Sequence, residues 1–181
     1  MDYRTKSISR DKLRQYSLVI KKIFKCRNKY FFDVIFAFEV LPLYLNNVTT
    51  EIVSDDDPDL KGAPATTIPD FCGNYSIKVK ETVYNKAYYD KNGGYRMHIM
   101  HEICHVILFM LGYLPFFDRA YKNNELKPYE SIEWQAKALA GEVLIPYETT
   151  RGMTLEQIMK KCKVSKEAAQ KRIDLDKDKE V

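Results

Sequence analysis

Three histidines occur in the 181 residues, and all of them fall between positions 98 and 105. Two belong to the run His101-Glu102-Ile103-Cys104-His105, which has the pattern HExxH. On a helix, residues four apart lie one turn above each other, so His101 and His105 would project from the same side and bind one zinc ion. Glu102 is turned away by one residue. Its carboxylate would reach a water molecule at the zinc without being a ligand, and would act as general base.

The helix that carries this motif is predicted from Tyr95 to Leu111, where apolar residues recur at helical spacing. Gly112 and then Pro115 favour its end. We expect the apolar stripe to anchor the helix to a core while the histidines, nearly opposite, face a cleft. The stripe comprises Ile99, Ile103, Val106, Ile107 and Met110.

A catalytic zinc site needs a third protein ligand and one open position. His98 is the remaining histidine, and it lies on the same helix face as His101 and His105. Three successive turns span about 10 Å of rise, which is too far to close a tetrahedron on one ion. His98 is therefore expected either beside the ligands, facing the substrate, or as an ordinary residue at the start of the helix.

The third ligand is expected to be an acid from another helix, predicted over Glu130–Ile145. Glu133 is the best candidate, because it shares a face with two alanines that would let this helix approach the zinc helix closely. Glu130 is the second candidate, and Glu142, toward the other end, is the third. The alternative for Glu133 is an exposed pair with Lys137, four residues on.

The remaining elements are predicted from periodicity and turn residues. Residues 8–30 have the pattern of an amphipathic helix. Val34–Val40 is either a helix that stops at Pro42 or a buried strand, because periodicity does not decide short apolar runs. Thr66–Ile68 and Tyr75–Val79 are predicted to pair as a hairpin.

The C-terminal part is predicted to contain two short helices, Leu155–Cys162 and Lys166–Ile173, the second capped by Ser165. Two short helices with net positive charge resemble a helix-turn-helix, which would allow nucleic-acid binding. We favour a helical pair that packs on the preceding domain. The predicted organisation is a zinc-binding domain over residues 1–150, with a basic N-terminal helix, followed by this helical element over residues 151–181.

Length, charge and cysteine usage narrow the class of protein. A chain of 181 residues fits one domain with a small addition. Its net charge of +4 divides into +8 for residues 1–30, −7 for residues 31–150 and +3 for residues 151–181. The N-terminus has no apolar stretch typical of a secretory signal, and no apolar run is long enough to span a membrane. The four cysteines form no CxxC pair, so we expect free thiols and a reducing cytoplasm.

Two segments carry a resemblance to a known family. Residues 96–105, RMHIMHEICH, are similar to the signature RFTxAHELGH of the ImmA/IrrE family of metallopeptidases. Residues 133–146, EWQAKALAGEVLIP, resemble that family's EWQANAFAGELLIP, in which the first Glu is the zinc ligand. Residues 154–172 resemble its trailing element, and the resemblance covers roughly residues 30–173. Cys104, Lys137 and Leu139 depart from the family's usual Gly, Asn and Phe.

The resemblance implies an α+β, gluzincin-like zincin fold. In this fold the HExxH helix and the helix of Glu133 pack on a small β-sheet, with extra helices at both ends of the chain. It also implies one Zn²⁺ ion, held by His101, His105 and Glu133, with Glu102 as the catalytic residue. Cys104 is expected to be a small buried hydrophobe, although a redox switch or a further zinc contact remains an alternative.

The activity implied by the family is that of an intracellular endopeptidase. Its protein substrate would be a helix-turn-helix repressor, a DNA-binding regulator encoded by a mobile element such as a prophage or by a stress-response locus. The alternative from another class is a zinc-binding regulatory or antitoxin-like protein. Such a protein would act by binding a partner or DNA without cleaving it.

Overall fold

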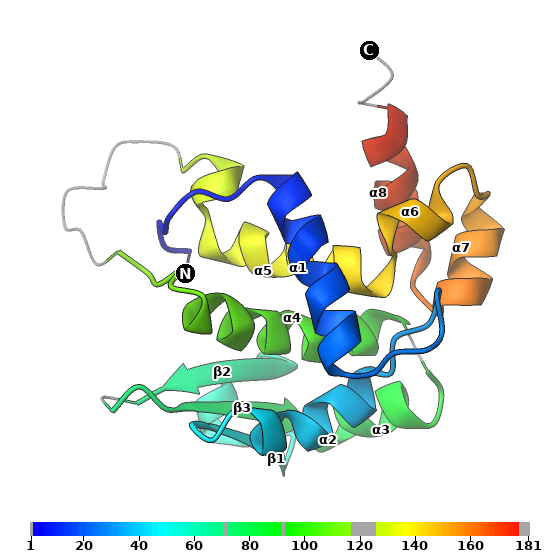
Figure 1. The fold of residues 1–181 in the computed structure, drawn as a ribbon. Coiled ribbons are helices and arrows are strands. Elements are labelled where there is room, and N and C mark those ends of the chain that lie inside the picture. Colours follow the sequence, from blue (N-terminus) through cyan, green and yellow to red (C-terminus); the bar gives the residue numbers. More distant parts are fainter. Residues whose placement is uncertain (1, 71, 92, 117–125, 178–181) are drawn as a thin grey trace.

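The computed structural model describes residues 2–70, 72–91, 93–116 and 126–177 (Figure 1). Helices and strands both occur, so the predicted α+β class is confirmed. In chain order the elements are α1 (Arg10–Ile23), α2 (Val34–Tyr44), β1 (Val48–Val53), the 3₁₀ turn η1 (Pro58–Leu60), β2 (Ala65–Pro69), β3 (Tyr75–Lys80), α3 (Glu81–Tyr88), α4 (Gly93–Met110), the 3₁₀ turn η2 (Pro128–Glu130), α5 (Ile132–Leu144), α6 (Tyr147–Thr150), α7 (Leu155–Cys162) and α8 (Lys166–Lys177).

The three strands form one mixed sheet in the order β1-β3-β2. β2 and β3 pair antiparallel, with Ala65 opposite Val79, so the predicted hairpin is confirmed. β1 pairs parallel to β3, with Val48 opposite Tyr75, and this strand was not predicted. The sheet therefore has β3 at its centre and leaves one side of β2 without a strand neighbour.

The helix of the HExxH motif, α4, lies at the centre of the fold. It contacts β2 and β3, and α2 and α3 also pack against it. α5 packs along α4 on the side away from the sheet, and α1 packs on α5 (Figure 1). The Glu133 helix therefore lies beside the HExxH helix, as expected, and α4 separates it from the sheet.

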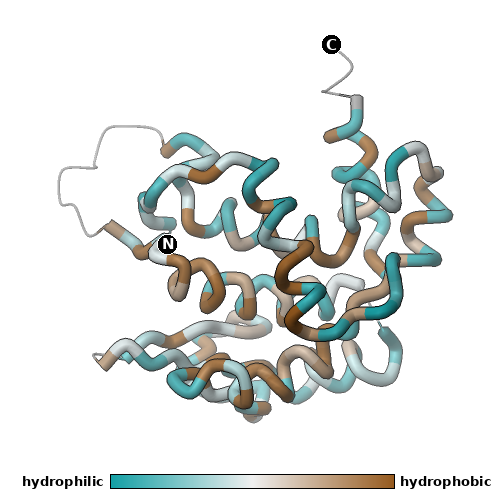
Figure 2. Tube along the Cα trace, in the orientation of Figure 1, coloured by the Kyte–Doolittle hydropathy of each residue, from teal (hydrophilic) through white to brown (hydrophobic). Residues whose placement is uncertain are grey.

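Because other elements pack around α4, buried residues occur on more of its faces than the predicted apolar stripe alone. Ile99, Ile103 and Val106 have no exposed surface, as predicted, but Met110 is 39% exposed, so the stripe was wrong at its last member. Cys104 is also fully buried although it lies off the stripe. Figure 2 shows hydrophobic residues through much of α4 and of α2 beneath it.

The bounds of α1 and α2 differ from the predicted ones. α1 ends at Ile23 rather than near residue 30, and Lys25 then adopts a positive φ of 50°, which a continuing helix does not allow. Val34–Val40 forms a helix rather than a strand, and α2 continues past Pro42 to Tyr44. Pro42 lies in the last turn, where its missing N–H removes a single bond from the end of the helix.

The C-terminal helices share one buried cluster with α4. α7 has the predicted bounds, whereas α8 extends past the predicted Ile173 to Lys177. Ile158 and Ala169 belong to the same apolar core as Ile99. Gly93 approaches the loop between α7 and α8 so closely that a Cβ there would lie 2.4 Å from the backbone of Val164. The boundary at residues 150 and 151 stays a prediction.

Among the helices of the described part, none is long and apolar enough to cross a membrane.

Candidate metal centre

His101 and His105 project from the same side of α4, as the four-residue spacing requires. Their Nε2 atoms are 2.9 Å apart, and their rings meet edge to face with centroids 4.5 Å apart. His105 is only 6% exposed and lies against the Phe109 ring, with centroids 5.7 Å apart. The second histidine is thus held by packing, while His101 is half-buried and borders the surface.

Glu133 lies in the first turn of α5, which begins after the N-cap residue Ser131. The Glu133 Oε2 atom is 3.1 Å from His101 Nε2, and its Oε1 atom is 3.5 Å from His105 Nε2. Hydrogen bonds from the two imidazoles hold the pKa of the Glu133 carboxyl well below its usual range. Two helices thereby bring two imidazole nitrogens and one carboxylate to a single point.

Glu102 completes the group from the next position of α4. His101, Glu102 and His105 offer ligand atoms that all lie within 4.8 Å of one another, so this group could hold a metal ion. Burial raises the pKa of Glu102, whereas the nearby His101 and hydrogen bonds from Thr67 oppose that rise. Thr67 also donates a hydrogen bond from Oγ1 to the main-chain carbonyl of Glu102, at 3.2 Å. Strand β2, which carries Thr67, therefore borders the site.

The donor set fits a metal ion. A tetrahedral zinc ion has ligand distances of about 2.0–2.2 Å to nitrogen and oxygen, which places neighbouring ligand atoms roughly 3.3–3.6 Å apart. The atoms of His101, His105 and Glu133 are separated by 2.9–3.5 Å, close to that spacing. Glu133 therefore lies where the sequence predicted a third ligand, and its role as a ligand stays a prediction.

Comparison with protein-family models decides the family. The model of a peptidase family described as the IrrE N-terminal-like domain matches residues 82–174, which is just over half of the chain. This chain belongs to that family. The resemblance noted in the sequence is thereby confirmed, and the family suggests a metallopeptidase with a metal cofactor. No curated protein and no solved structure matches the chain.

The match to the IrrE N-terminal-like domain runs from α3 to α8 and so includes both helices of the metal centre. The other predicted candidates lie elsewhere. His98 is exposed at the surface of α4. Its pKa is lowered by the part of the ring that is shielded from water and by the positive charges of His101 and Lys137. Cys104 is fully buried and is outside the His-Glu-His group, in agreement with a small buried hydrophobe.

The two alternative acids have partners among the first residues of the chain, outside the part that matches the IrrE N-terminal-like domain. Glu130 belongs to η2 rather than to α5, and its carboxylate pairs with Arg4 at 3.0 Å. Glu142 is buried on α5 and pairs with Arg10 at 3.1 Å and with Arg14 at 3.5 Å. Both carboxylates are therefore engaged with arginines, which leaves Glu133 as the acid beside the histidines.

Sequence reasoning missed Asp2, which lies next to the metal centre. The Asp2 carboxylate accepts hydrogen bonds from Ser131 Oγ at 2.6 Å and from the Glu133 main-chain N–H at 3.3 Å. Tyr3 also accepts a hydrogen bond from the Ile132 N–H, so the N-terminal segment lies along the start of α5. An acidic side chain at a helix N-terminus stabilises the first turn, and this one helps to fix the position of Glu133. No local pattern connects residues so distant in sequence.

Proposed function

We propose that this protein is a zinc-dependent endopeptidase. The observation that supports this proposal best is the meeting of the His101, His105 and Glu133 side chains beside Glu102. Two imidazole nitrogens and one glutamate oxygen are a ligand set of catalytic zinc sites, which leave a position open for water or substrate. These three residues would hold the zinc ion, and Glu102 would act as the catalytic residue.

Zinc in this site would polarise the scissile carbonyl and lower the pKa of a water molecule. Glu102 would accept a proton from that water molecule as it attacks the carbonyl carbon. The C–N bond of the peptide then breaks, and Glu102 returns the proton to the leaving amine. Its burial on α4 supports this double role, because a carboxyl group with a raised pKa retains a proton more readily between the two steps.

The substrate is proposed to bind as an extended chain along β2. Among the described residues this strand pairs only with β3, on one side, so we expect the main-chain groups of its other side to be available to an added strand. Thr67 lies in β2 and contacts the Glu102 main chain, which places an added strand close to the general base. Of the two strands of the hairpin, β2 is the one that makes this contact, so it is the strand proposed here.

The protein substrate is proposed to be a helix-turn-helix repressor from a mobile element or a stress-response locus. Support comes from membership in the IrrE N-terminal-like family and from charge. Residues 31–150, which include every residue of the metal centre, have a net charge of −7. DNA-binding proteins carry basic surfaces, so an acidic domain would attract such a substrate at low ionic strength.

The test is co-expression with a helix-turn-helix regulator encoded next to this gene, followed by mass spectrometry of the fragments. Glu102→Gln should retain one zinc ion per chain and lose cleavage by about 100-fold or more, since general acid–base catalysis contributes on the order of 10²–10⁴. The matched control is Glu148→Gln, because Glu148 is an exposed acid on α6. This control should cleave the regulator as the wild type does.

Other outcomes would contradict the proposal. Normal cleavage by Glu102→Gln would exclude this residue as the base. An uncut regulator in a stable complex with the wild-type protein would favour the alternative, a zinc-binding regulatory or antitoxin-like protein. Salt-dependent duplex binding by the whole chain, with no cleavage, would favour a role for α7 and α8 in DNA binding.

A further inference from the structure

A cavity of about 220 Å³ lies between α5 and α8, with one residue of α1 at its edge. Its walls are mostly apolar, but four cationic side chains and two acids also line it. The apolar walls include Met97, Ala138, Ile145, Ala168 and Leu175. The cations are Arg10, Lys137, Lys171 and Arg172, and the acids are Glu142 and Glu167.

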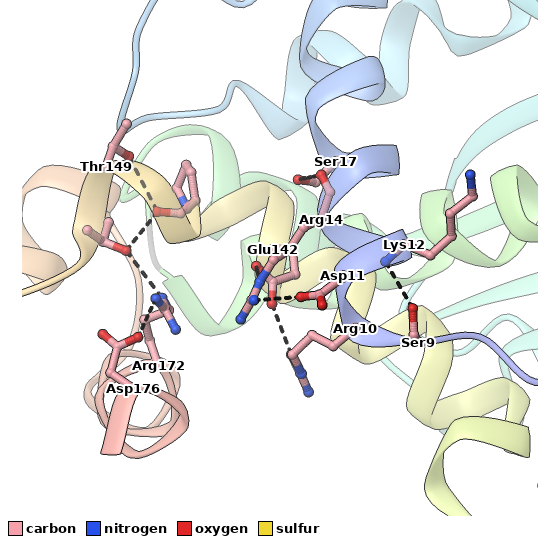
Figure 3. A network of polar contacts seen from close by, with 12 residues as sticks. Ser9, Arg10, Asp11, Lys12, Arg14, Ser17, Glu142, Thr149, Arg172 and Asp176 are labelled. Atoms are coloured by element: carbon pink, nitrogen blue, oxygen red, sulfur yellow. Dashed lines mark hydrogen bonds and ion pairs between the residues drawn. The ribbon is translucent and has the colours of Figure 1, made fainter. Parts of the chain in front are cut away.

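Arg172 is the most restrained of the four cations. Only 4% of the residue is exposed, and its guanidinium stacks on the Tyr147 ring, 4.4 Å from the centroid. Its Nε donates to Thr150 Oγ1 at 3.3 Å and its Nη2 to Asp176 Oδ1 at 2.8 Å, the contacts drawn in Figure 3. Its Nη1 is buried and has no hydrogen-bond partner among the described residues. The Arg172 guanidinium is thus held in place, and the residue contributes a fixed positive charge to the lining of the cavity.

The two lysines add positive charge without an acidic partner. Lys137 on α5 and Lys171 on α8 form no ion pair in the part of the chain that the structure describes. Partial burial and the charges of Lys137 and Arg10 lower the pKa of Lys171. These three cations therefore lie close enough to repel one another, and an anion between them would relieve that repulsion.

The two acids offset this positive charge only in part. Glu142 is shared by Arg10 at 3.1 Å and Arg14 at 3.5 Å, and Figure 3 shows both arginines reaching it from α1. Glu167 lies in the first turn of α8 and stays ionised, because hydrogen bonds from its own main-chain N–H and from Ser165 lower its pKa. Four cations still outnumber two acids in the lining, so the cavity keeps an excess of positive charge beside an apolar wall.

We propose that this cavity binds a small organic anion, a phosphate monoester with a compact apolar body. The phosphate would accept hydrogen bonds from the ammonium groups of Lys137 and Lys171, with the charge of Arg172 close by. The apolar body would contact Ile145 and Leu175. A volume of about 220 Å³ suits a small molecule rather than a nucleic-acid strand, which needs a long basic stripe. This site is distinct from the metal centre and does not depend on peptidase activity.

The test uses the zinc-loaded whole protein and phenyl phosphate as the probe, measured by titration calorimetry. We expect saturable binding to the wild type and binding at least ten-fold weaker to the double variant Lys137→Gln/Lys171→Gln. The matched control is Lys160→Gln/Lys166→Gln, which removes the same charge from two exposed lysines of α7 and α8 that do not line the cavity. This control should bind phenyl phosphate within two-fold of the wild type.

Methyl NMR distinguishes this cavity from the metal centre, which phosphate also contacts in zinc enzymes. Phenyl phosphate should shift the methyl resonances of Ile145 and Leu175 and leave those of Ile52, on β1, unchanged. Ala168→Leu, which fills the cavity without changing charge, should weaken binding of phenyl phosphate but not of inorganic phosphate. Equal weakening in both double variants, shifts at the Thr67 methyl group beside the metal centre instead of Ile145, or no saturable binding would each overturn the proposal.

Discussion

Arg96 connects the helix of the metal centre to the C-terminal helices, and its removal is expected to destabilise the whole fold. The residue lies on α4 and is 1% exposed. Its Nη1 donates to the carbonyls of Cys162, at 2.9 Å, and of Lys163, and its Nη2 donates to the Phe32 carbonyl at 2.6 Å. One guanidinium thus satisfies three carbonyls from two loops.

The size of the effect follows from these contacts. Hydrogen bonds to charged groups contribute about 1.5–3 kcal/mol each, or about 4.5–9 kcal/mol for three. Burial lowers the pKa of Arg96 to about 10, so the side chain stays charged at neutral pH. The cost of burying that charge, about 3 kcal/mol, opposes the stabilisation by the three hydrogen bonds. Arg96→Met should therefore lower the free energy of unfolding by about 1.5–6 kcal/mol. For a chain of this size, that corresponds to a fall in Tm of roughly 3–24 °C.

Thermal unfolding followed by circular dichroism measures this change. Arg151→Met is the matched control, because Arg151 is exposed beyond α6 and its loss should shift Tm by less than about 2 °C. Arg96→Lys retains the charge with fewer donors and should fall between the wild type and Arg96→Met. If Arg96→Met unfolds within 2 °C of the control, the three hydrogen bonds do not hold the C-terminal helices on α4.

Two further predictions concern packing and thiol reactivity. Gly93→Ala should destabilise the protein by about 2 kcal/mol, because the added Cβ would lie 2.4 Å from the backbone of Val164. Urea unfolding measures this change. An unchanged unfolding midpoint would show that the two segments separate easily. Iodoacetamide at pH 8 should modify exposed Cys72 at least 100-fold faster than Cys162, since burial shields the Cys162 thiol and raises its pKa to about 11. The two rates are read from mass spectra of the peptides. Equal rates would contradict the burial of Cys162.

Local patterns in the sequence predicted the elements that carry the candidate site. The HExxH spacing and the apolar periodicity located α4, and the hairpin β2–β3 and the bounds of α7 were also predicted. The sequence favoured Glu133 over Glu130 and Glu142, and the structure places the Glu133 carboxylate within 3.5 Å of both histidines. Its role as a ligand stays a prediction.

Features that depend on distant pairs could not be predicted from one sequence. β1 joins β3 across more than twenty residues, and nothing in its own pattern selects a parallel partner. The burial of Glu142 depends on Arg10 and Arg14, which lie about 130 positions earlier. Met110 illustrates the same limit, because periodicity gives the face of a helix but not where the neighbouring elements stop covering it.

The contact between Asp2 and the start of α5 has a consequence for the order of folding. Asp2 and Ser131 are 129 positions apart, so during synthesis Asp2 must wait for all the residues between them before its partner exists. Contacts of such sequence separation close a long loop and are slow to form. The β-hairpin and α4, with both histidines, can assemble earlier from neighbouring segments. Attachment of the N-terminal segment beside Glu133 is therefore expected among the last steps of folding, and a metal taken up before it would meet only the two histidines.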